Sequence, residues 1–597
     1  MAMKKIDVMC TAFRDGFQSV FGARVHMEDF VPALEAAVDA GINHFESGGG
    51  AMFQSPFFYV NENSFENMDR FREIAGPDAN LQTLARGVNV VGLDSQSSDI
   101  IELHARLFKK HGVTTIRNFD ALNDVNNLEY SGKCIVDNGL KHEVVVTMME
   151  LPPGCTGAHD VAFYEKTLRN IIDSDLPYSS VCFKDASGTA TPKKVFETIK
   201  MAKKILPADT PVRFHTHETA GISVHCYMAA IEAGVDGIDL SISPVSGGTA
   251  QPDILTMMHA LKGSQYDLGM DINKIREVEA IFKDCMKDYF IPPEAGSVSP
   301  VIPFSPMPGG ALTANTQMLR DNDMLDKYPE IITAMGEVVC RGGYGTSVTP
   351  VSQFYFQQSF NNVIFGPWEK FAEGYGKMIL GYFGRTPVEP DPELVKIASE
   401  KLDLMPTDKK VLEINDADPE KGIEAARRLL REHALEETDE NLFISAACKE
   451  KGIAFLKGEG KVRVRKIVKS KEGAKKISDT FMVTVDGRKY PVILKDDVVT
   501  VEGRKYKIKV EEGIPDITKP LPGPSEDTLE IKTPFPGTVI RVLREANKRV
   551  VKNEVIMIIE AMKMESEIKA PRNGVVVSMD VKAGDSVSAN QVVARLG

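Results

Sequence analysis

The stretch SSVCFKDASGTATPKKVFETIKMAKKILPADTPVRFHTHETAGISVHCYMAAIEAGVDGIDLSI, residues 179–242, indicates the fold class. It contains three short apolar runs, SSVCFKD, PVRFHTH and VDGIDLSI, separated by two longer amphipathic stretches. Short apolar runs of this length are typical of buried strands, and the longer stretches are typical of helices. Strands and helices in regular alternation indicate βα units and a parallel sheet.

The same rhythm extends from residue 6 to about residue 290. Further strand-like runs are IDVMCTAF at 6–13, INHFES at 42–47 and HEVVVTMM at 142–149. Eight βα units fit this length as a closed barrel. We therefore predict an α/β fold in which residues 1–295 form a (β/α)8 TIM barrel.

The rest of the chain divides into four segments with different residue patterns. Residues 296–460 show heptad-like apolar spacing, as in KGIEAARRLLREHALEE, and predict a helical extension. Residues 461–513 alternate β-branched and polar residues between Asp-Gly and Glu-Gly turns, which predicts a small antiparallel β module. The Pro-rich stretch 514–527 is typical of a linker. Residues 528–597 contain two Pro/Gly-started β units around EAMKME, which predicts a small β-sandwich.

Charge and hydropathy exclude several functional classes. The chain has 597 residues and a formal net charge of -13, which argues against a nonspecific nucleic-acid-binding protein. Its main basic run, KVRVRKIVKSKEGAKK at 461–476, alternates charges with Val and Ile, so we interpret it as the solvated face of a half-buried strand. No apolar run reaches ~18 residues and no signal peptide is recognisable. We expect a cytoplasmic protein that neither crosses nor enters a membrane.

The eight cysteines are scattered, without CxxC or other short paired spacing. This distribution favours reduced, mostly buried thiols over a disulfide framework or a cysteine metal site.

Four polar residues form a candidate metal site. His215 and His217 are two residues apart on a predicted strand, so both side chains face the same side. Taken alone, this pair is equally compatible with two structural histidines. Asp15 and Lys184 end two other strand-like runs, and catalytic groups of such barrels gather at the C-terminal ends of strands. A bare ammonium would repel a cation, whereas a lysine carbamylated by CO2 becomes an anionic oxygen ligand.

A lysine lies between two predicted strands of the C-terminal segment. In VIMIIEAMKMESEIKAP at 555–571, a hairpin apex would expose Lys563 to solvent. The segment 528–597 resembles the biotin carboxyl carrier domain, whose lysine is modified within an Ala-Met-Lys-Met turn. An ordinary hairpin and the related lipoyl carrier are the alternatives, but lipoyl domains lack methionines on both sides of the lysine. One departure is REANKRVVKN at 544–553, where the family usually has a Gly-Asp turn.

Motifs along the whole chain extend this resemblance. They are Arg-Asp-x-x-Gln-Ser at 14–19, Ala-Arg-Gly-x-Asn at 85–89, Asn-Phe-Asp-Ala-Leu-Asn-Asp at 118–124, Phe-Lys-Asp at 183–185, His-Thr-His at 215–217, Ser-Gly-Gly-Thr-x-Gln-Pro at 246–252, Met-Pro-Gly-Gly at 307–310, Thr-Pro-x-Ser-Gln at 349–353 and Gly-Tyr-Phe-Gly-Arg-Thr-Pro at 381–387. The chain thus resembles the biotin-dependent carboxyltransferase family, which includes the B subunit of pyruvate carboxylase and the oxaloacetate decarboxylase alpha subunit.

The resemblance implies a role for each matching residue. It implies that Asp15, His215, His217 and carbamylated Lys184 hold a divalent metal, for which mixed nitrogen and oxygen ligation suits Zn, Mn or Co. It implies further that Arg86 pairs with the substrate carboxylate, that Gln18 binds the carbonyl side of the substrate, and that Thr219 shuttles a proton between the substrate methyl and biotin. The implied reaction is metal-dependent carboxyl transfer between carboxybiotin on Lys563 and a small 2-oxo acid, pyruvate or oxaloacetate. Asp120 and Asp124 we assign to strand-end structure.

Two positions depart from the family pattern. Leu93 and Gly48 stand where related enzymes commonly carry a tyrosine and a tryptophan. Loss of an aromatic wall would enlarge the substrate pocket, so 2-oxoglutarate is an alternative substrate.

The implied partners include a source of carboxyl groups, because no phosphate-binding loop accompanies the barrel. We expect a separate biotin carboxylase subunit, as in two-subunit pyruvate carboxylases, with biotin protein ligase as the modifying enzyme and a homo-oligomeric state. Two alternatives remain: the alpha subunit of a membrane, sodium-pumping oxaloacetate decarboxylase, and a carrier scaffold with an inactive barrel. The linker has no long Ala/Pro tract, which favours the soluble carboxylase.

Overall fold

The structure, a computed structural model, describes residues 3–467, 480–485, 488–495, 498–501, 504–507, 528–534, 536–561, 564–588 and 590–597. The chain forms two compact units, Met1–Lys466 and Ile467–Gly597.

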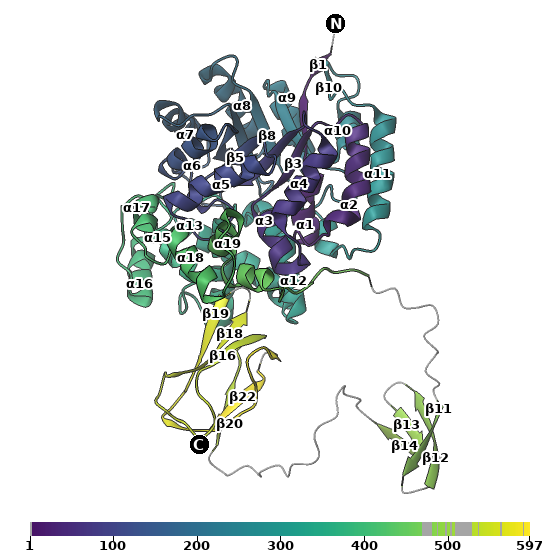
Figure 1. Cartoon of the computed structure of the whole chain (residues 1–597), viewed down its shortest axis with the longest axis vertical. Helices are drawn as coiled ribbons and strands as arrows, with labels where there is room; N and C mark the ends of the chain where they lie inside the picture. The colour runs from purple at the N-terminus through teal and green to yellow at the C-terminus, as the bar shows by residue number, and fades with distance from the viewer. Residues whose placement is uncertain are drawn as a thin grey trace. The chain divides into compact units, whose positions relative to one another are not determined.

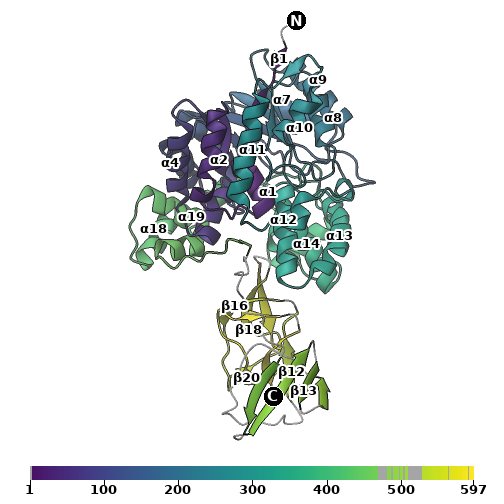
Figure 2. The same ribbon diagram turned by 90° about the vertical axis from the view of Figure 1, so that its right-hand side faces the viewer.

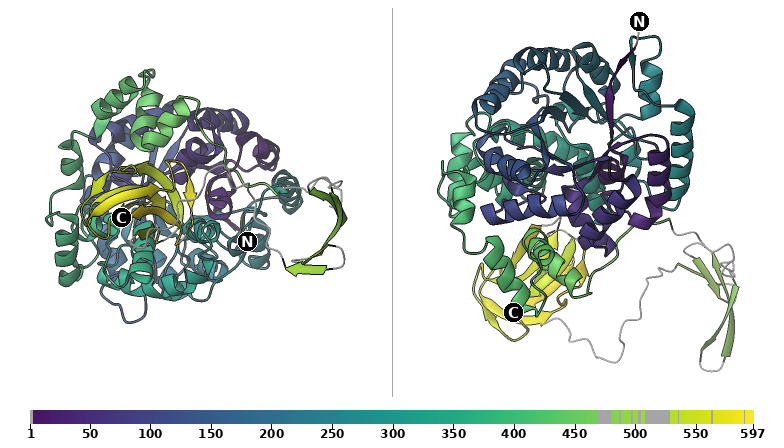
Figure 3. Two further views of the ribbon diagram at one scale, coloured as in Figure 1. Left: turned by 90° about the horizontal axis from the view of Figure 1, so that it is seen from below. Right: turned by 45° about the horizontal axis from the view of Figure 1, so that its top comes forward.

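The first unit contains a closed barrel of eight parallel strands in chain order, surrounded by helices (Figure 1; Figure 3, right). The strands are β2 (Asp7–Cys10), β3 (His44–Gly49), β4 (Asn80–Ala85), β5 (Thr115–Asn118), β6 (Lys141–Thr147), β7 (Ser180–Asp185), β8 (Val212–Thr216) and β9 (Gly237–Leu240). The helices are α1 (Phe17–Phe21), α2 (Met27–Asp39), α3 (Ala51–Ser55), α4 (Ser64–Ala75), α5 (Ser98–Lys110), α6 (Asn126–Asp137), α7 (Val161–Asp173), α8 (Pro192–Ile205), α9 (Ser223–Glu232), α10 (Ile254–Ala260) and α11 (Ile272–Met286). The predicted TIM barrel is confirmed.

Period-two alternation assigns each barrel residue to one of two environments. Phe183 of β7 and Phe214 of β8 belong to the buried apolar core that the surrounding helices share. The residues that alternate with them, Lys184 and His215, are also buried but polar. On these two strands, therefore, the phenylalanines lie under the helices and the charged or polar side chains lie in the barrel interior.

A helical extension follows the barrel, as predicted. Its helices are α12 (Gly309–Asp321), α13 (Tyr328–Arg341), α14 (Val351–Phe365), α15 (Glu373–Ile379), α16 (Pro392–Leu402), α17 (Val411–Asp416), α18 (Gly422–Glu432) and α19 (Asp439–Leu456). Helices α13 and α14 pack on each other, and α12 packs on α1 of the barrel (Figure 2). Phe443 of α19 contacts Phe53 of the barrel with ring centroids 5.3 Å apart, so the two parts share a second apolar core.

The expectation that all cysteines are reduced is wrong. Cys155, in the loop after β6, forms a disulfide with Cys340 of α13, with a Cα–Cα distance of 6.2 Å. The two residues are 185 positions apart, and only the packing of the extension on the barrel brings them together. Spacing along the sequence therefore held no signal for this pair. The other six cysteines are free, and Cys285 is the least buried of them.

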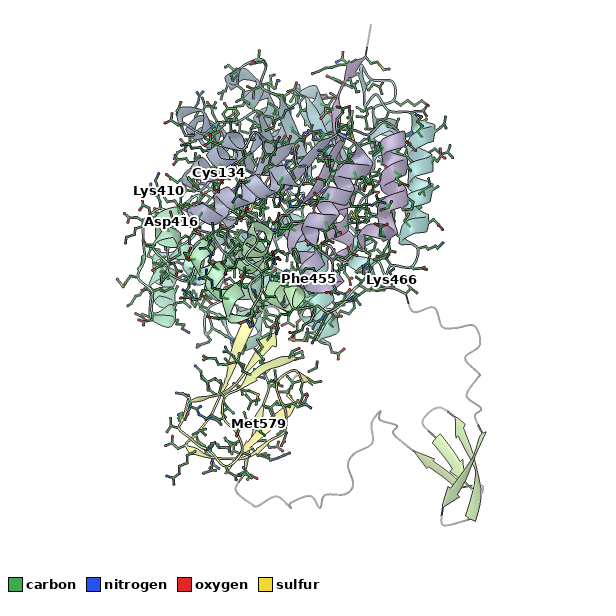
Figure 4. All side chains as sticks on the ribbon, in the orientation of Figure 1. Cys134, Lys410, Asp416, Phe455, Lys466 and Met579 are labelled. Atoms are coloured by element: carbon green, nitrogen blue, oxygen red, sulfur yellow. A yellow bond between two sulfur atoms is a disulfide. The ribbon has the colours of Figure 1, made fainter. Side chains whose placement is uncertain are left out.

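The described part of the basic run packs along the first unit. Val464 contacts the barrel core, Arg465 forms an ion pair with Asp321, and Lys466, labelled in Figure 4, pairs with Asp29. These residues form no strand beyond an isolated bridge between Lys466 and Tyr289. The rest of the run, 468–476, lies outside the described residues.

Strands joined by turns make up the described residues of the second unit, and none of these residues is helical. A four-stranded antiparallel sheet consists of β11 (Thr480–Val485), β12 (Arg488–Lys495), β13 (Val498–Val501) and β14 (Arg504–Lys507), as predicted for the small module. Two further four-stranded sheets, β15-β22-β20-β17 and β19-β18-β16-β21, form the C-terminal domain. Their strands are β15 (Leu529–Lys532), β16 (Gly537–Val542), β17 (Arg549–Val550), β18 (Val555–Ala561), β19 (Met564–Lys569), β20 (Gly574–Met579), β21 (Ser586–Val587) and β22 (Val592–Leu596).

The predicted linker, 514–527, lies outside the described residues. Across the described ranges, no helix combines the length and the apolar content needed to span a bilayer.

Replacing Cys340 by Ser is expected to lower the free energy of unfolding of the oxidised first unit by about 2–4 kcal/mol, because a cross-link between distant residues restricts the unfolded chain. Calorimetry of the full chain measures this change, and Cys285→Ser, which removes a free thiol, is the control. Addition of a reductant should abolish the difference between the variant and the wild type. Thiol titration of the denatured, oxidised protein should find six thiols, and finding all eight would refute the cross-link.

Candidate metal and substrate site

The four predicted metal residues meet at the C-terminal ends of β7, β8 and β2, of which β7 and β8 are neighbours and β2 is separated from β8 by β9. Asp15 lies in the helical turn after β2, Lys184 lies near the end of β7, and His215 and His217 lie at the end of β8. The register of β7 and β8 pairs Lys184 directly with His215. All four side chains are buried, with at most 5% of any side chain exposed.

Short distances join these side chains. Nε2 of His215 and Nε2 of His217 lie 3.1 Å apart, and each lies 3.4 Å from Oδ2 of Asp15. Nζ of Lys184 lies 2.7 Å from Nε2 of His215 and 3.8 Å from Oδ2 of Asp15. Asp15, His215 and His217 thus offer ligand atoms within 4.8 Å of one another, a set that can hold a metal ion.

The hydrogen bond made by Nδ1 of each imidazole determines whether Nε2 of the same ring carries a proton or a lone pair. Nδ1 of His215 lies 2.8 Å from a carboxylate oxygen of Asp239, and Nδ1 of His217 lies 2.7 Å from the carbonyl oxygen of Thr249. Both oxygens only accept hydrogen bonds, so each Nδ1 must carry the proton. A neutral imidazole protonated at Nδ1 has a lone pair at Nε2. Two lone pairs and a carboxylate therefore face one another, an arrangement that a bound cation stabilises.

The pKa shifts of Asp15 and Lys184 are also consistent with a cation site. Burial would raise the pKa of Asp15, but the charge of Arg14 and the two imidazoles outweigh it and hold the pKa well below its usual value. Burial lowers the pKa of Lys184, and Asp15 offsets this only in part. A buried lysine with a lowered pKa is more readily neutral, and only a neutral amine can react with CO2.

Sequence reasoning missed three residues of this pocket. Nε2 of Gln251 lies 3.0 Å from Nε2 of His217 and 3.1 Å from Oδ2 of Asp15. Arg14 contacts Asp15 at 3.1 Å and forms a buried ion pair with Glu46. Gln251 lies in the motif at 246–252 and Arg14 in the motif at 14–19. A polar residue inside such a motif was the sequence signal that could have identified them.

Arg86 is a buried guanidinium that has no charged partner in the part of the chain that the structure describes. Its Nη1 donates to the carbonyl oxygens of Val91 at 2.6 Å and Gly92 at 3.0 Å, and its buried Nε finds no acceptor among the described residues. Burial and the nearby charge of Arg14 lower the pKa of Arg86 to about 9. Such a group favours an anion beside it, because an unpaired buried charge is costly.

Gln18 and Thr219 adjoin the metal cluster through their neighbours. Oε1 of Gln18 accepts a hydrogen bond from Nη1 of Arg14 at 3.2 Å. The hydroxyl of Thr219 donates to the carbonyl oxygen of Ser187, three residues after Lys184. Gln18 thus contacts the residue before Asp15, and Thr219 contacts the segment that follows Lys184.

Two other residues singled out in the sequence, Asp120 and Leu93, have defined surroundings. Asp120 accepts hydrogen bonds from the backbone of Leu122 and Asp124 and from Asn127, a turn-forming pattern. Burial and the charge of Asp124 raise the pKa of Asp120 to about 7. Leu93 is 37% exposed, and its carbonyl accepts from Asn89.

The predicted biotin attachment site lies in the sequence between β18 and β19, two antiparallel strands. Strands β18 and β19 pair as far as Ala561 and Met564. Lys563 lies outside the described residues.

Comparison with known proteins agrees with this fold. A family model described as a conserved carboxylase domain matches residues 302–494, one described as HMGL-like matches 152–282, and one described as a biotin-requiring enzyme matches 529–596. These matches define a biotin-dependent enzyme.

Two curated relatives and a solved structure narrow the class. The chain is 28% identical over 573 residues to the B subunit of pyruvate carboxylase from Methanocaldococcus jannaschii, with 94% of each chain covered. It is also 28% identical to the 2-oxoglutarate carboxylase large subunit of Hydrogenobacter thermophilus, covering 95% of this chain and 91% of that one. The carboxyl transferase domain from Rhizobium etli pyruvate carboxylase has the same fold, with a TM-score of 0.69, 22% identity and 85% of this chain and 88% of that chain covered. The chain belongs to the family of biotin-dependent carboxyltransferases.

Replacing His217 by Ala is expected to weaken binding of a divalent metal by more than about 100-fold, because loss of a ligand should exceed the effect of losing a ligand's hydrogen-bond partner. Elemental analysis of the purified full chain measures this change, with the exposed His225→Ala as control. Biotinylation of the variant should be unchanged. Full metal content in His217→Ala would contradict the assignment.

Proposed function

We propose that the chain is the carboxyltransferase-plus-carrier subunit of a two-subunit pyruvate carboxylase, which transfers a carboxyl group between biotin on Lys563 and pyruvate. The observation that carries the proposal is the convergence of Asp15, His215 and His217 on one point, with Lys184 beside them, at the catalytic end of the barrel. In this proposal Lys184 is carbamylated and completes the ligand set. The metal is Zn, Mn or Co, because ligands of mixed nitrogen and oxygen type suit these ions.

Each remaining residue has a task in binding and orientation. Arg86, whose Nε lacks an acceptor among the described residues, holds the substrate carboxylate with its planar guanidinium. Gln18 and Arg14, which contact each other, donate to the carbonyl side of the substrate. A divalent cation in the cluster supplies a Lewis acid that stabilises the enolate.

Proton movement is assigned to Thr219. Its hydroxyl is buried and bonded to the carbonyl oxygen of Ser187, so it must rotate away from that oxygen to exchange a proton with substrate. Burial of the surrounding side chains excludes water, which would otherwise reprotonate the enolate. The same groups acting in the reverse direction decarboxylate oxaloacetate.

The proposed partners are the proteins that would supply this chain with a carboxyl group and with biotin. The carboxyl group is supplied by a separate biotin carboxylase subunit, and the biotin is attached by biotin protein ligase. We further propose that the protein is cytoplasmic and homo-oligomeric.

A second candidate substrate is 2-oxoglutarate. Gly48 and Leu93 replace the aromatic residues that are common in the family, and a relative of equal identity is named as a 2-oxoglutarate carboxylase subunit. A larger acid requires room near these two positions. At Gly48, an added Cβ would meet only Thr83, at 3.7 Å, which is ordinary van der Waals contact.

The deciding experiment combines the biotinylated chain with a biotin carboxylase subunit, ATP and labelled bicarbonate, and offers pyruvate and 2-oxoglutarate in separate reactions. The proposal expects label in oxaloacetate from pyruvate. Label only in carboxylated 2-oxoglutarate would replace pyruvate by the second candidate. No label in either acid, with biotin fully carboxylated, would overturn the carboxylase assignment.

Arg86→Gln should raise KM for the 2-oxo acid by ~10- to 100-fold, because a hydrogen bond to a charged group contributes about 1.5–3 kcal/mol. Steady-state kinetics at varied acid concentration measure this change. The exposed Arg169→Gln is the matched control, and metal content should be unaffected. An unchanged KM would remove Arg86 from the substrate site.

A further inference from the structure

A ring of polar side chains crosses the barrel interior, one layer from the candidate metal site toward the N-terminal ends of the strands. Its charged and amide members come from every barrel strand except β7, whose Ser180 donates to Glu143 at 3.3 Å. They are Asp7, His44, Gln82, Arg117, Glu143, Arg213 and Asp239. TIM barrels usually fill this space with branched apolar side chains, so a charged layer here is unusual.

Hydrogen bonds close the ring. His44 contacts Asp7 at 3.1 Å and Gln82 at 2.9 Å, and Gln82 donates to Glu143 at 2.7 Å. Arg117 then links Glu143 to Asp239. On the other side, Arg213 donates to Asp239 at 3.2 Å and also contacts Asp7.

The ring meets the metal site at one side chain. Oδ2 of Asp239 accepts from Nδ1 of His215 at 2.8 Å and from Arg117, while Oδ1 accepts from Arg213. The hydroxyl of Tyr227 donates to the backbone carbonyl of Asp239. Asp239, Arg117 and His215 are all fully buried. Hydrogen bonds therefore hold Asp239 at both carboxylate oxygens and at its backbone carbonyl oxygen.

The two histidines of the candidate metal site differ in the hydrogen-bond partner of Nδ1. The partner of His217 is the neutral backbone carbonyl of Thr249, whereas the partner of His215 is a charged carboxylate with two guanidinium groups behind it. A carboxylate behind an imidazole fixes the ring and its tautomer and raises its basicity as a ligand.

The ring also borders solvent on its far side. A cavity of about 470 Å³ at the N-terminal mouth of the barrel is lined by Asp7, Gln82, Glu143 and Arg213, among others, but not by Arg117 or Asp239. The two members that contact His215 are thus the ones that stay away from this cavity.

We propose that Asp239, held by Arg117 and Arg213, is a positioning residue that sets the orientation and ligand strength of His215. The inference rests on the proposed metal site. Burying this many charges in a barrel is costly, and a hydrophobic layer would fill the same space, so stability alone does not account for the ring.

The test compares Asp239→Asn with Glu143→Gln in the full chain. Both changes neutralise one buried carboxylate of the same ring, but only Asp239 contacts His215. Release of bound Co²⁺ to a chelator is followed by loss of the Co²⁺ absorption spectrum, and thermal unfolding is recorded in parallel. Asp239→Asn is expected to release Co²⁺ about 10- to 100-fold faster and to change the spectrum, while Glu143→Gln changes stability with release within about threefold of wild type.

The outcomes separate the two proposals. If the wild type binds no Co²⁺, the metal site itself fails. If the wild type binds Co²⁺ and Asp239→Asn releases it at the wild-type rate, only the positioning role fails. Equal acceleration in both variants would assign the effect to general loss of barrel integrity and would also overturn the role. If Asp239→Asn does not fold, Arg213→Lys, which removes the guanidinium that donates to Oδ1 of Asp239, should still accelerate release, and an unchanged rate would count against the role.

Discussion

Two imidazole nitrogens and a carboxylate oxygen face one another inside the barrel, with no proton between the imidazoles to relieve their repulsion. The backbone carbonyl of Thr249 and the carboxylate of Asp239 take the protons of the outer nitrogens, so the inner nitrogens present lone pairs. Nζ of Lys184 and the amide of Gln251 lie beside these lone pairs, and a cation among the three ligand atoms would be stabilised by all of them. Much of the surrounding structure, from Arg14 to the polar ring, keeps these atoms in place.

The parallel barrel supplies the geometry for that arrangement. Neighbouring strands bring Lys184 and His215 into register, and β9, between β8 and β2, brings Asp239 behind His215. Alternation along β7 and β8 separates packing from chemistry. Outward residues such as Phe183 and Phe214 pack under helices, whereas inward residues such as Lys184 and His215 supply polar groups. Function and stability therefore use different faces of the same strands.

The extension helps to complete the site. A Cβ at Gly309, the first residue of α12, would overlap the Thr249 carbonyl that orients His217, so the close approach of α12 requires glycine at that position. A Cβ at Gly310 would lie 3.2 Å from the side chain of Gln18. The disulfide between Cys155 and Cys340 connects the same two parts of the chain. The extension thus contributes to the pocket as well as covering apolar surface.

Local patterns in the sequence determined a large part of this description. Alternating strands and helices predicted the barrel, and the spacing of His215 and His217 predicted that both face one side, because periodicity is a property of neighbouring residues.

Only the tertiary structure decided which distant residues meet. Asp239 behind His215, Gln251 beside Asp15 and Cys155 against Cys340 join positions 24, 236 and 185 residues apart. No local pattern encodes such pairs, because they depend on how strands and helices pack, and packing is settled by the whole core at once. The residue types for the chemistry could be read from the sequence, whereas the hydrogen bonds that orient them could not.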